Sequence, residues 1–293
     1  MNSQSDVEAI SGNLPISMPP APERVIKAKK GLVGVDFAEL WRYRELFLFL
    51  AWRNVLVHYK QTAVGIVWAF IRPLLTMVVF TVIFGKVAKL PSDGIPYPIL
   101  TFAALLPWQF FSNSLTQSSN SLIANPNLIS KIYFPRLIIP SSAVLSSVID
   151  FLISFSLFIG LMFWYRTVPT LAVLWLPLFF LLALVCSLGM GMWFSALNVE
   201  YRDVQHAVPF MVQLGLYVSP VGFSSSIIPE KWRLLYSLNP MAGVIDGFRW
   251  ALLGQKVPLY QDGLLLSIAV ALFMLLTGTL YFKKMERTFA DVI

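Results

Sequence analysis

The chain has 293 residues, of which 57% are hydrophobic and 13% are charged, and its formal net charge is +7 at pH 7. Because soluble domains carry about 25% charged residues, this composition excludes a soluble enzyme of ordinary design, a disordered protein and a small disulfide scaffold. A lipid bilayer is the solvent that suits most of the chain.

The amino-terminal part of the chain has two segments. Residues 1–35 are polar, contain several prolines and then become basic, without the apolar core of a cleavable signal peptide. We interpret them as a flexible cytoplasmic tail. Residues 36–60 place apolar side chains at helical spacing but include three arginines and two glutamates. This segment is too charged to cross a bilayer and fits an amphipathic helix at the cytoplasmic interface. A soluble helix packed on a partner protein is the alternative.

Six apolar stretches follow, each with the roughly 20 residues that a membrane-spanning helix needs. Prolines and Asn-Pro pairs define the ends of the longer stretches. The predicted spans are residues 64–84, 99–123, 137–164, 171–197, 207–226 and 264–282. The predicted fold is therefore an all-α integral membrane protein with six transmembrane helices.

The basic residues predict how these spans are oriented. With the amino terminus in the cytoplasm, 15 of the 22 lysines and arginines lie on the cytoplasmic side, where positive residues accumulate in membrane proteins. Both termini are therefore predicted to be cytoplasmic. Orientation explains the surplus of positive charge, so nucleic-acid binding is not expected.

Residues 234–253 are apolar enough to suggest a seventh span. However, an Asn-Pro pair interrupts them, Asp246 and Arg249 lie one turn apart, and a seventh span would place the C-terminal lysines outside. We therefore predict a re-entrant helical hairpin on the outer side, between spans five and six, beginning around Ser219. Non-helical backbone at membrane depth requires contact with protein or a water-filled cavity, so this hairpin is a candidate element of a transport pathway.

The sequence contains no recognisable catalytic constellation. The two histidines, His58 and His206, lie far apart, and there is no G-x-x-x-x-G-K-[ST] phosphate-binding loop. We therefore predict no catalytic residue, metal or cofactor in this chain. One acidic residue inside a predicted span, Asp150, is a candidate proton relay. The alternative that we favour is that Asp150 pairs with an arginine or with a polar face.

Two predicted cytoplasmic loops are candidate contact sites. Residues 125–136 begin with an Asn-Pro helix break and are predicted to expose a patch of apolar side chains, which is typical of a partner-binding surface. The patch consists of Leu128, Ile129, Ile132, Tyr133 and Phe134. Contact with lipid headgroups is the alternative. The second loop, residues 198–206, contains Glu200, Arg202 and Asp203. Their mixed charges favour a salt-bridged cytoplasmic gate or packing against the interface helix, and a solvated turn is the alternative.

Aromatic residues make up 14% of the chain. Many lie near span ends, where tryptophan and tyrosine are expected. Others fall inside spans one and five, and aromatic rings there would suit a polysaccharide conduit because they stack on the C–H faces of sugars. The candidates for lining such a path are Trp68, Phe80, Phe84, Phe210 and Tyr217.

Several strings, taken together, carry a family resemblance. They are GIVWAFIRPLL at residues 65–75, NPNLISKIYFPR at 125–136, LNVEYRDV at 197–204, YVSPV at 217–221 and SLNPM at 237–241. With these strings the chain resembles the membrane permease of type-2 ABC exporters of O-antigen, capsular polysaccharide or teichoic acid. The resemblance covers about residues 37–285 and leaves the first 35 residues outside.

The resemblance implies a homodimer of six-span subunits in the bacterial inner membrane, with residues 61–293 as the transmembrane permease domain. Two copies of a separate ABC ATPase would bind ATP and magnesium. Residues 36–60 would be the interface (gate) helix, and spans one and five of both protomers would line the substrate path. The implied ATPase-coupling helix contains Asn127, Leu128, Ile129, Lys131, Ile132, Tyr133, Phe134 and Arg136.

The function predicted on these grounds is ATP-driven export of a lipid-linked polysaccharide, such as O-antigen, across the inner membrane. The chain itself would be a permease without an ATPase site. Export of a drug or small lipid is the alternative within the same class. A membrane-embedded glycosyl- or acyltransferase is the alternative from another class, and the missing acid–base cluster weakens it.

Overall fold

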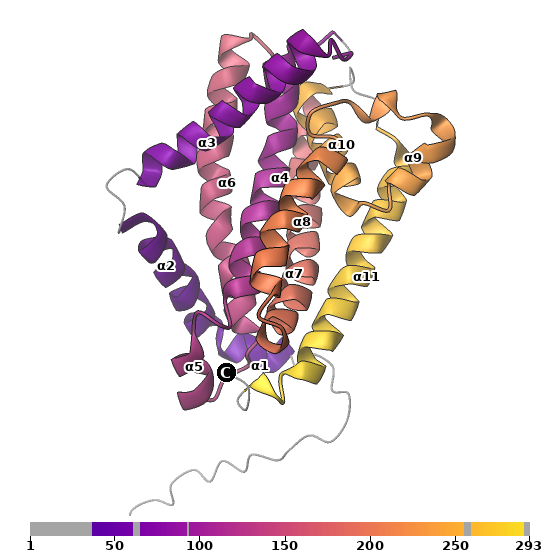
Figure 1. The fold of residues 1–293 in the computed structure, drawn as a ribbon. Helices are drawn as coiled ribbons and strands as arrows, with labels where there is room; N and C mark the ends of the chain where they lie inside the picture. Colours follow the sequence, from indigo (N-terminus) through magenta and orange to yellow (C-terminus); the bar gives the residue numbers. More distant parts are fainter. Residues whose placement is uncertain (1–36, 61–64, 93, 255–258, 290–293) are drawn as a thin grey trace, which may run out of the picture. The chain divides into compact units, whose positions relative to one another are not determined.

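A computed structural model describes residues 37–60, 65–92, 94–254 and 259–289. The described residues all belong to one compact unit. The predicted tail of residues 1–35 lies outside the described residues. Within the described ranges every regular element is a helix (Figure 1), so the predicted all-α class is confirmed.

The helices differ widely in length. α1 (Phe37–Arg42) and α2 (Arg44–Lys60) come first, and α3 (Gly65–Phe80) continues directly into the π-helix η1 (Thr81–Val87). The long helices that follow are α4 (Tyr97–Asn120), α6 (Ile138–Trp164), α7 (Leu176–Glu200) and α11 (Gln261–Met285). The shorter elements between them are α5 (Pro126–Lys131), η2 (Leu171–Trp175), α8 (Val204–Val218), η3 (Ser225–Ile227), α9 (Glu230–Tyr236) and α10 (Pro240–Leu253).

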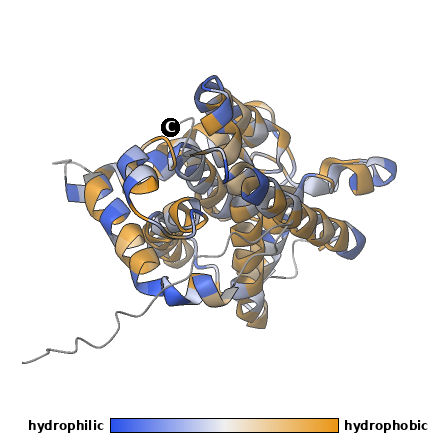
Figure 2. Cartoon of the chain, turned by 90° about the horizontal axis from the view of Figure 1, so that it is seen from below, coloured by the Kyte–Doolittle hydropathy of each residue, from blue (hydrophilic) through white to orange (hydrophobic). Residues whose placement is uncertain are grey.

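In the described ranges, four helical stretches are long and apolar enough to cross a membrane: Val67–Val87, Ile138–Trp164, Leu171–Glu200 and Gln261–Met285. They coincide with predicted spans one, three, four and six. Hydrophobic residues, in orange, predominate in the helix bundle (Figure 2). The chain is therefore an integral membrane protein. Predicted span two corresponds to α4, whose second half is polar, and predicted span five to α8, which has only 15 residues. The count of six spans stays a prediction.

Helix α4 lies at the centre of the packing. It contacts α6, α7, α8 and α10, and nearly all of its side chains from Ile99 to Phe111 are buried. Small residues on α7 permit the close contact with α4, since a Cβ added at Gly191 would lie 2.5 Å from the Ser118 hydroxyl oxygen. Ser187 and Ser195, one turn to either side of Gly191, are buried as well.

Helices α7 and α11 meet backbone to backbone. A Cβ at Gly278 would lie 2.3 Å from the carbonyl oxygen of Gly189, and a Cβ at Gly189 would lie 2.7 Å from the backbone nitrogen of Leu275. Only residues without side chains allow this approach. The two glycines therefore fix the crossing point of the two helices.

The shorter elements gather at opposite ends of the bundle (Figure 1). At one end, α1, α2, α5 and the end of α11 surround a small apolar core that includes Leu50, Ile129, Phe134, Phe282 and Phe289. At the other end lie α9 and α10, the two helices into which the predicted hairpin folds. α10 packs against α4, α7 and α11.

The predicted interface helix consists of two helices, α1 and α2, with a break at Tyr43. α2 buries Leu50 and Ala51 against the chain but exposes Phe49 and Trp52. Apolar side chains therefore lie on more than one side of α2, unlike those of a simple amphipathic helix. Its location at the membrane interface stays a prediction.

Candidate functional site

The predicted coupling segment consists of α5 and the residues that follow it. Pro126 occupies the first helical position, where its missing N–H costs no hydrogen bond. The helix ends at Lys131, and Ile132 is extended. The helical part is therefore shorter than the predicted coupling helix of residues 127–136.

The eight predicted coupling residues divide by exposure. Tyr133 is 69% exposed, whereas its neighbour Phe134 is 5% exposed and belongs to the small apolar core. The exposed side chains are those of Asn127, Lys131, Ile132 and Tyr133; the buried ones are Ile129 and Phe134; Leu128 and Arg136 are half-buried. The expectation that the loop presents all of its apolar residues is thus wrong for Ile129 and Phe134, because they pack inside the chain.

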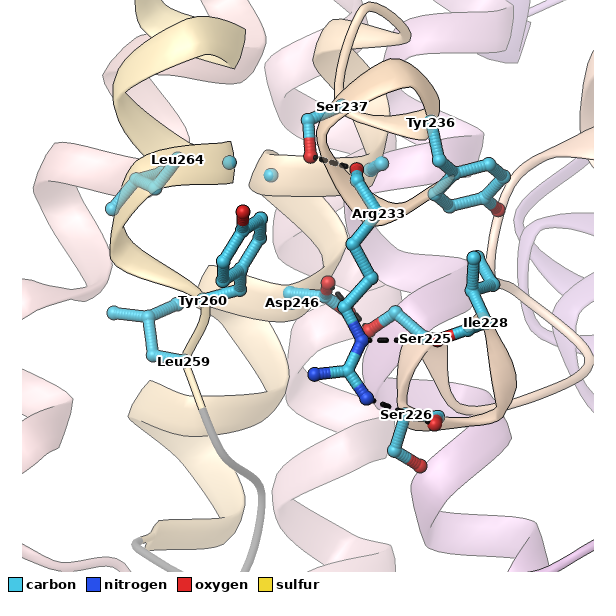
Figure 3. Close-up of a pocket in the computed structure, with 13 residues that line it drawn as sticks. Ser225, Ser226, Ile228, Arg233, Tyr236, Ser237, Asp246, Leu259, Tyr260 and Leu264 are labelled. Carbon is cyan, nitrogen blue, oxygen red and sulfur yellow. Dashed lines mark hydrogen bonds between the residues drawn. The ribbon is translucent and has the colours of Figure 1, made fainter. Parts of the chain in front are cut away.

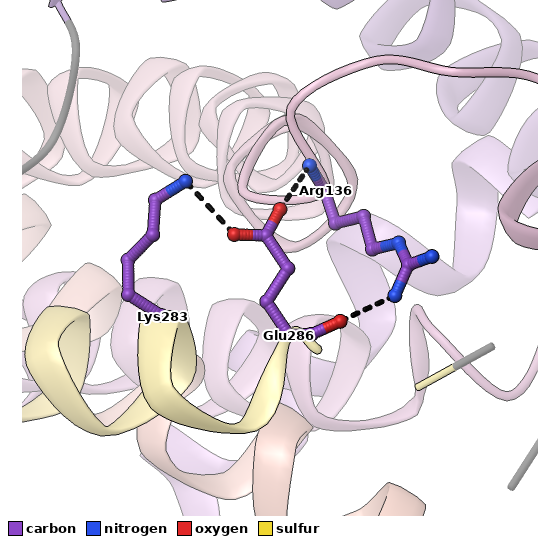
Figure 4. A network of polar contacts seen from close by, with 3 residues as sticks. All are labelled: Arg136, Lys283 and Glu286. Carbon is purple, nitrogen blue, oxygen red and sulfur yellow. Dashed lines mark hydrogen bonds and ion pairs between the residues drawn. The ribbon is translucent and has the colours of Figure 1, made fainter. Parts of the chain in front are cut away.

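Arg136 attaches the end of this segment to the end of α11 (Figure 4). Its backbone N–H donates a hydrogen bond to Glu286 Oε1 at 3.0 Å, and its guanidinium donates to the backbone carbonyl of Glu286. Lys283 Nζ lies 2.8 Å from Glu286 Oε2. The guanidinium also lies 6.0 Å from the ring centroid of Phe289, a cation–π distance. These contacts connect the end of the predicted coupling segment to the end of the last helix.

Asn125 attaches the beginning of the segment to α2 and α4. Arg53 Nη2 donates to Asn125 Oδ1 at 2.7 Å, and Asn125 Nδ2 donates to the backbone carbonyl of Ser121 at 2.8 Å. A hydrogen bond from a charged donor is stronger than a neutral one. The sequence indicated Asn125 only as a helix breaker, and it offered no signal for the roles of Arg53 and Glu286.

Of the three predicted gate residues, Glu200 is the last residue of α7, and Arg202 and Asp203 lie in the turn before α8. All three are exposed. Glu200 Oε2 accepts a hydrogen bond from the Tyr281 hydroxyl of α11 at 3.3 Å. The backbone carbonyl of Asp203 accepts from the N–H of His206 and thereby starts α8. Arg202 extends from the same exposed turn. The structure thus links Glu200 to α11, while a gating role for the three residues stays a prediction.

Asp150, on α6, pairs with a polar face. It accepts hydrogen bonds from the hydroxyl of Tyr59, at the end of α2, and from Asn113 Nδ2 of α4 at 3.4 Å. One turn earlier, the Ser146 hydroxyl donates to Gln117 Oε1 at 2.9 Å. Burial, and then the neighbouring Asp150, raise the pKa of Tyr59 above its ordinary value, so the phenol stays protonated and able to donate.

Three of the five aromatic candidates lie together. Phe80 stacks on Tyr217 with ring centroids 6.2 Å apart, and Phe84 lies 5.2 Å from Phe80. Phe80 is 5% exposed and Tyr217 is 57% exposed, so Phe80 supports the Tyr217 ring from beneath. Trp68 and Phe210 are also exposed. The surface formed by α3 and α8 therefore presents aromatic rings outward from this chain.

Comparison with known proteins places these features in a family. Residues 45–253 match the family described as ABC-2 type transporter. The chain belongs to the ABC-2 type transporter family. Permeases of this family are transport subunits, so the chain is a membrane transport component of an ABC system.

Individual relatives match over most of the chain. The O-antigen export system permease protein RfbA of Klebsiella pneumoniae is 30% identical over 250 residues, which cover 85% of this chain and 95% of the relative. The protein of the same name from Myxococcus xanthus is 29% identical over 258 residues, covering 87% and 98%. The polysialic acid transport protein KpsM of Escherichia coli is 24% identical over 237 residues, covering 78% and 87%.

Proposed function

We propose that this chain is the permease subunit of an exporter that moves a lipid-linked polysaccharide, such as O-antigen, from the cytoplasm across the inner membrane. The observation that carries this proposal is the match over 85% of the chain to a permease named for O-antigen export. The more distant match to a polysialic acid transport protein supports the same substrate class. A separate ABC ATPase would supply the energy.

The exposed part of the coupling segment is the proposed contact with that ATPase. Ile132 and Tyr133 are exposed and follow directly after α5, which lies at the end of the bundle (Figure 1). Large exposed apolar side chains favour a protein contact. Asn125 and Arg136 hold the two ends of the segment on α2 and α11. Closure of the ATPase, which would bind ATP and magnesium, would therefore reach both helices at once.

Two copies of the chain, each with one ATPase subunit, would form the working transporter. The aromatic surface of α3 and α8 would then face the partner protomer and line the path, with Trp68, Phe210 and Tyr217 exposed to it and Phe80 and Phe84 supporting them. Glu200, Arg202 and Asp203 would lie at its cytoplasmic mouth. The hairpin of α9 and α10 would be re-entrant at the outer end, with both termini in the cytoplasm.

Deleting the gene tests this function directly. We expect the polysaccharide to disappear from the cell surface and to accumulate inside the cell, and we expect a plasmid copy of the gene to restore export. Immunoblotting of surface and intracellular fractions measures both. Unchanged surface polysaccharide would refute the proposal and favour export of a drug or small lipid. Loss from the surface without accumulation inside would instead favour a transferase.

A further inference from the structure

A polar pocket lies at the end of the bundle that carries α9 and α10, away from the coupling segment. It has a volume of about 160 Å³. Figure 3 shows Arg233, Asp246 and Tyr260 around the same space, with Ser225 and Ser226 at its edge. Three elements build it, since these residues come from the η3–α9 region, from α10 and from the start of α11.

Arg233 and Asp246, whose side chains carry opposite charges when ionised, line this pocket. Among the described residues, each of them has a polar atom without a hydrogen-bond partner. Arg233 donates through Nε to the carbonyl of Ile228 at 3.0 Å and through Nη2 to that of Ser226 at 3.1 Å, which leaves Nη1 for another acceptor. Asp246 Oδ2 accepts from the Ser225 hydroxyl at 2.6 Å. Its Oδ1 is buried without a hydrogen-bond partner, which is costly for a carboxylate.

An apolar cavity of about 570 Å³ adjoins the polar pocket. The two share Leu259 and Leu264. The walls of the apolar cavity come mainly from α7 and α11, on the side of their Gly189–Gly278 crossing where both helices begin. Both helices are candidate membrane spans, and lining side chains such as Leu181 and Leu265 are exposed. The cavity is therefore an open groove between two candidate spans.

We propose that the two cavities form one binding site for a phospholipid whose headgroup carries both a phosphate and a primary amine, such as phosphatidylethanolamine. The phosphate would pair with Arg233 Nη1, as guanidinium groups do with phosphate oxygens. The amine would donate to Asp246, and an acyl chain would occupy the groove between α7 and α11. The site is separate from the coupling segment and does not depend on the transported substrate.

The shape of the combined cavity favours a lipid over a sugar of the transported polysaccharide. A saccharide would place its hydroxyls along the groove, where the lining residues are almost all leucine, isoleucine, valine, phenylalanine and tryptophan, and would leave those hydroxyls unsatisfied. A phospholipid joins a polar headgroup to apolar acyl chains, which matches a polar pocket beside an apolar cavity. Its paired charges also match the opposite signs of Arg233 and Asp246.

Lipid binding to the purified full-length protein tests the site. Native mass spectrometry would be used to titrate the protein with phosphatidylethanolamine and, separately, with phosphatidylglycerol of identical acyl chains. We expect phosphatidylethanolamine to bind at least tenfold more tightly. Asp246→Asn should reduce this preference to less than threefold, and Arg233→Gln should weaken binding of both lipids. Lys231→Gln, at an exposed lysine of α9, should leave binding unchanged.

Three results would overturn the proposal. They are equal binding of the two lipids to the unmodified protein, a folded Asp246→Asn variant with the original preference, and displacement of phosphatidylethanolamine by a soluble oligosaccharide. The first comparison needs no substitution, so the test stands even where a variant fails to fold. A bulky substitution in the groove, Ile268→Trp, should weaken both lipids equally.

Discussion

At the scale of single residues, the contact between Tyr59 and Asp150 joins α2 to the helix bundle. Tyr59 is the penultimate residue of α2, and Asp150 also receives a hydrogen bond from Asn113. Burial removes water from a carboxylate, and hydrogen bonds from protein donors offset that cost. Removing one of these donors is therefore destabilising. This contact therefore holds the last turn of α2 against α6.

Tyr59→Phe removes the hydroxyl and keeps the ring. We expect the unfolding free energy at pH 7 to fall by about 1 kcal/mol, the typical contribution of one hydrogen bond, which thermal unfolding in detergent would measure. The raised pKa of Tyr59 means that the folded state keeps the proton that the unfolded chain releases near pH 10. The difference between the two proteins should therefore be constant below about pH 9 and shrink as the pH rises above 10.

The control is Tyr43→Phe, at the break between α1 and α2, whose ring packs on the small apolar core at the other end of α2. It leaves the hydrogen bond from Tyr59 to Asp150 in place, so it should not reproduce the loss of stability expected of Tyr59→Phe at pH 7. A Tyr59→Phe protein as stable as the unmodified one at every pH would contradict the assigned hydrogen bond.

At the scale of elements, the proposed coupling segment places two adjacent aromatic residues in different environments. Tyr133 lies on its outer side, while Phe134 completes the small apolar core with Ile129 and Phe289. Because an extended chain alternates the sides to which its residues point, the end of α5 at Lys131 places these two rings on opposite sides. One ring is available to a partner, and the other stabilises the fold.

Tyr133→Ala and Phe134→Ala should therefore fail in different ways. Tyr133→Ala should keep the thermal stability of the unmodified protein but lose export while the ATPase still hydrolyses ATP. Phe134→Ala should lower the unfolding free energy by about 3–5 kcal/mol, the usual cost of deleting a buried phenylalanine ring. Measuring stability, ATP hydrolysis and export for both variants separates these effects. Normal export by Tyr133→Ala would remove this residue from the proposed ATPase contact.

At the scale of the whole molecule, the two ends of the bundle differ in what they carry. The end with α5 holds the coupling segment and the end of α11, and the opposite end holds α9, α10 and the polar pocket. The proposed orientation places the first end in the cytoplasm. The single cysteine, Cys186, is completely buried, so a thiol reagent added from either side should report only on introduced cysteines.

Labelling with a membrane-impermeant maleimide tests this orientation. In a Cys186→Ala background, Lys231→Cys on α9 should react in intact spheroplasts, and Lys131→Cys on α5 should react only after lysis. Both lysines are exposed, so both cysteines should react fully in detergent, which serves as the control. Labelling of both positions from the same side would contradict an arrangement with α5 inside and α9 outside.

Much of the helical framework could be predicted because the signals for it are local. The lengths of the apolar runs place predicted spans one, three, four and six on α3–η1, α6, α7 and α11. The Asn-Pro pair at residues 239–240 marks the start of α10, where the Asn239 side chain accepts a hydrogen bond from the Met241 N–H. The polar residues in the second half of α4 weakened the sequence signal for a membrane span there. Their burial could not be read from the sequence because it depends on α6 and α7 packing against α4.

The candidate site could be predicted only in part, for a related reason. The composition of residues 125–136 indicated a contact surface, but a list of apolar residues does not reveal which of them pack inward. Phe134 and Ile129 are buried because α2 and α11 bring other apolar side chains to them. The partners of Arg136 lie 150 residues away in the chain, and no local pattern pairs positions at such a separation.

The sequence alone determined that this protein occupies a bilayer, that it is helical, and to which family it belongs. Run length, charge placement and short strings of residues are properties of the chain that need no fold to be recognised. Only the tertiary structure decided that Tyr133 is exposed while Phe134 is buried, and that Tyr59 and Asn113 donate hydrogen bonds to Asp150. It also decided that a polar pocket adjoins an apolar groove. Each of these depends on helices far apart in the sequence meeting at one place, because exposure, hydrogen bonding and cavities arise from contacts between them.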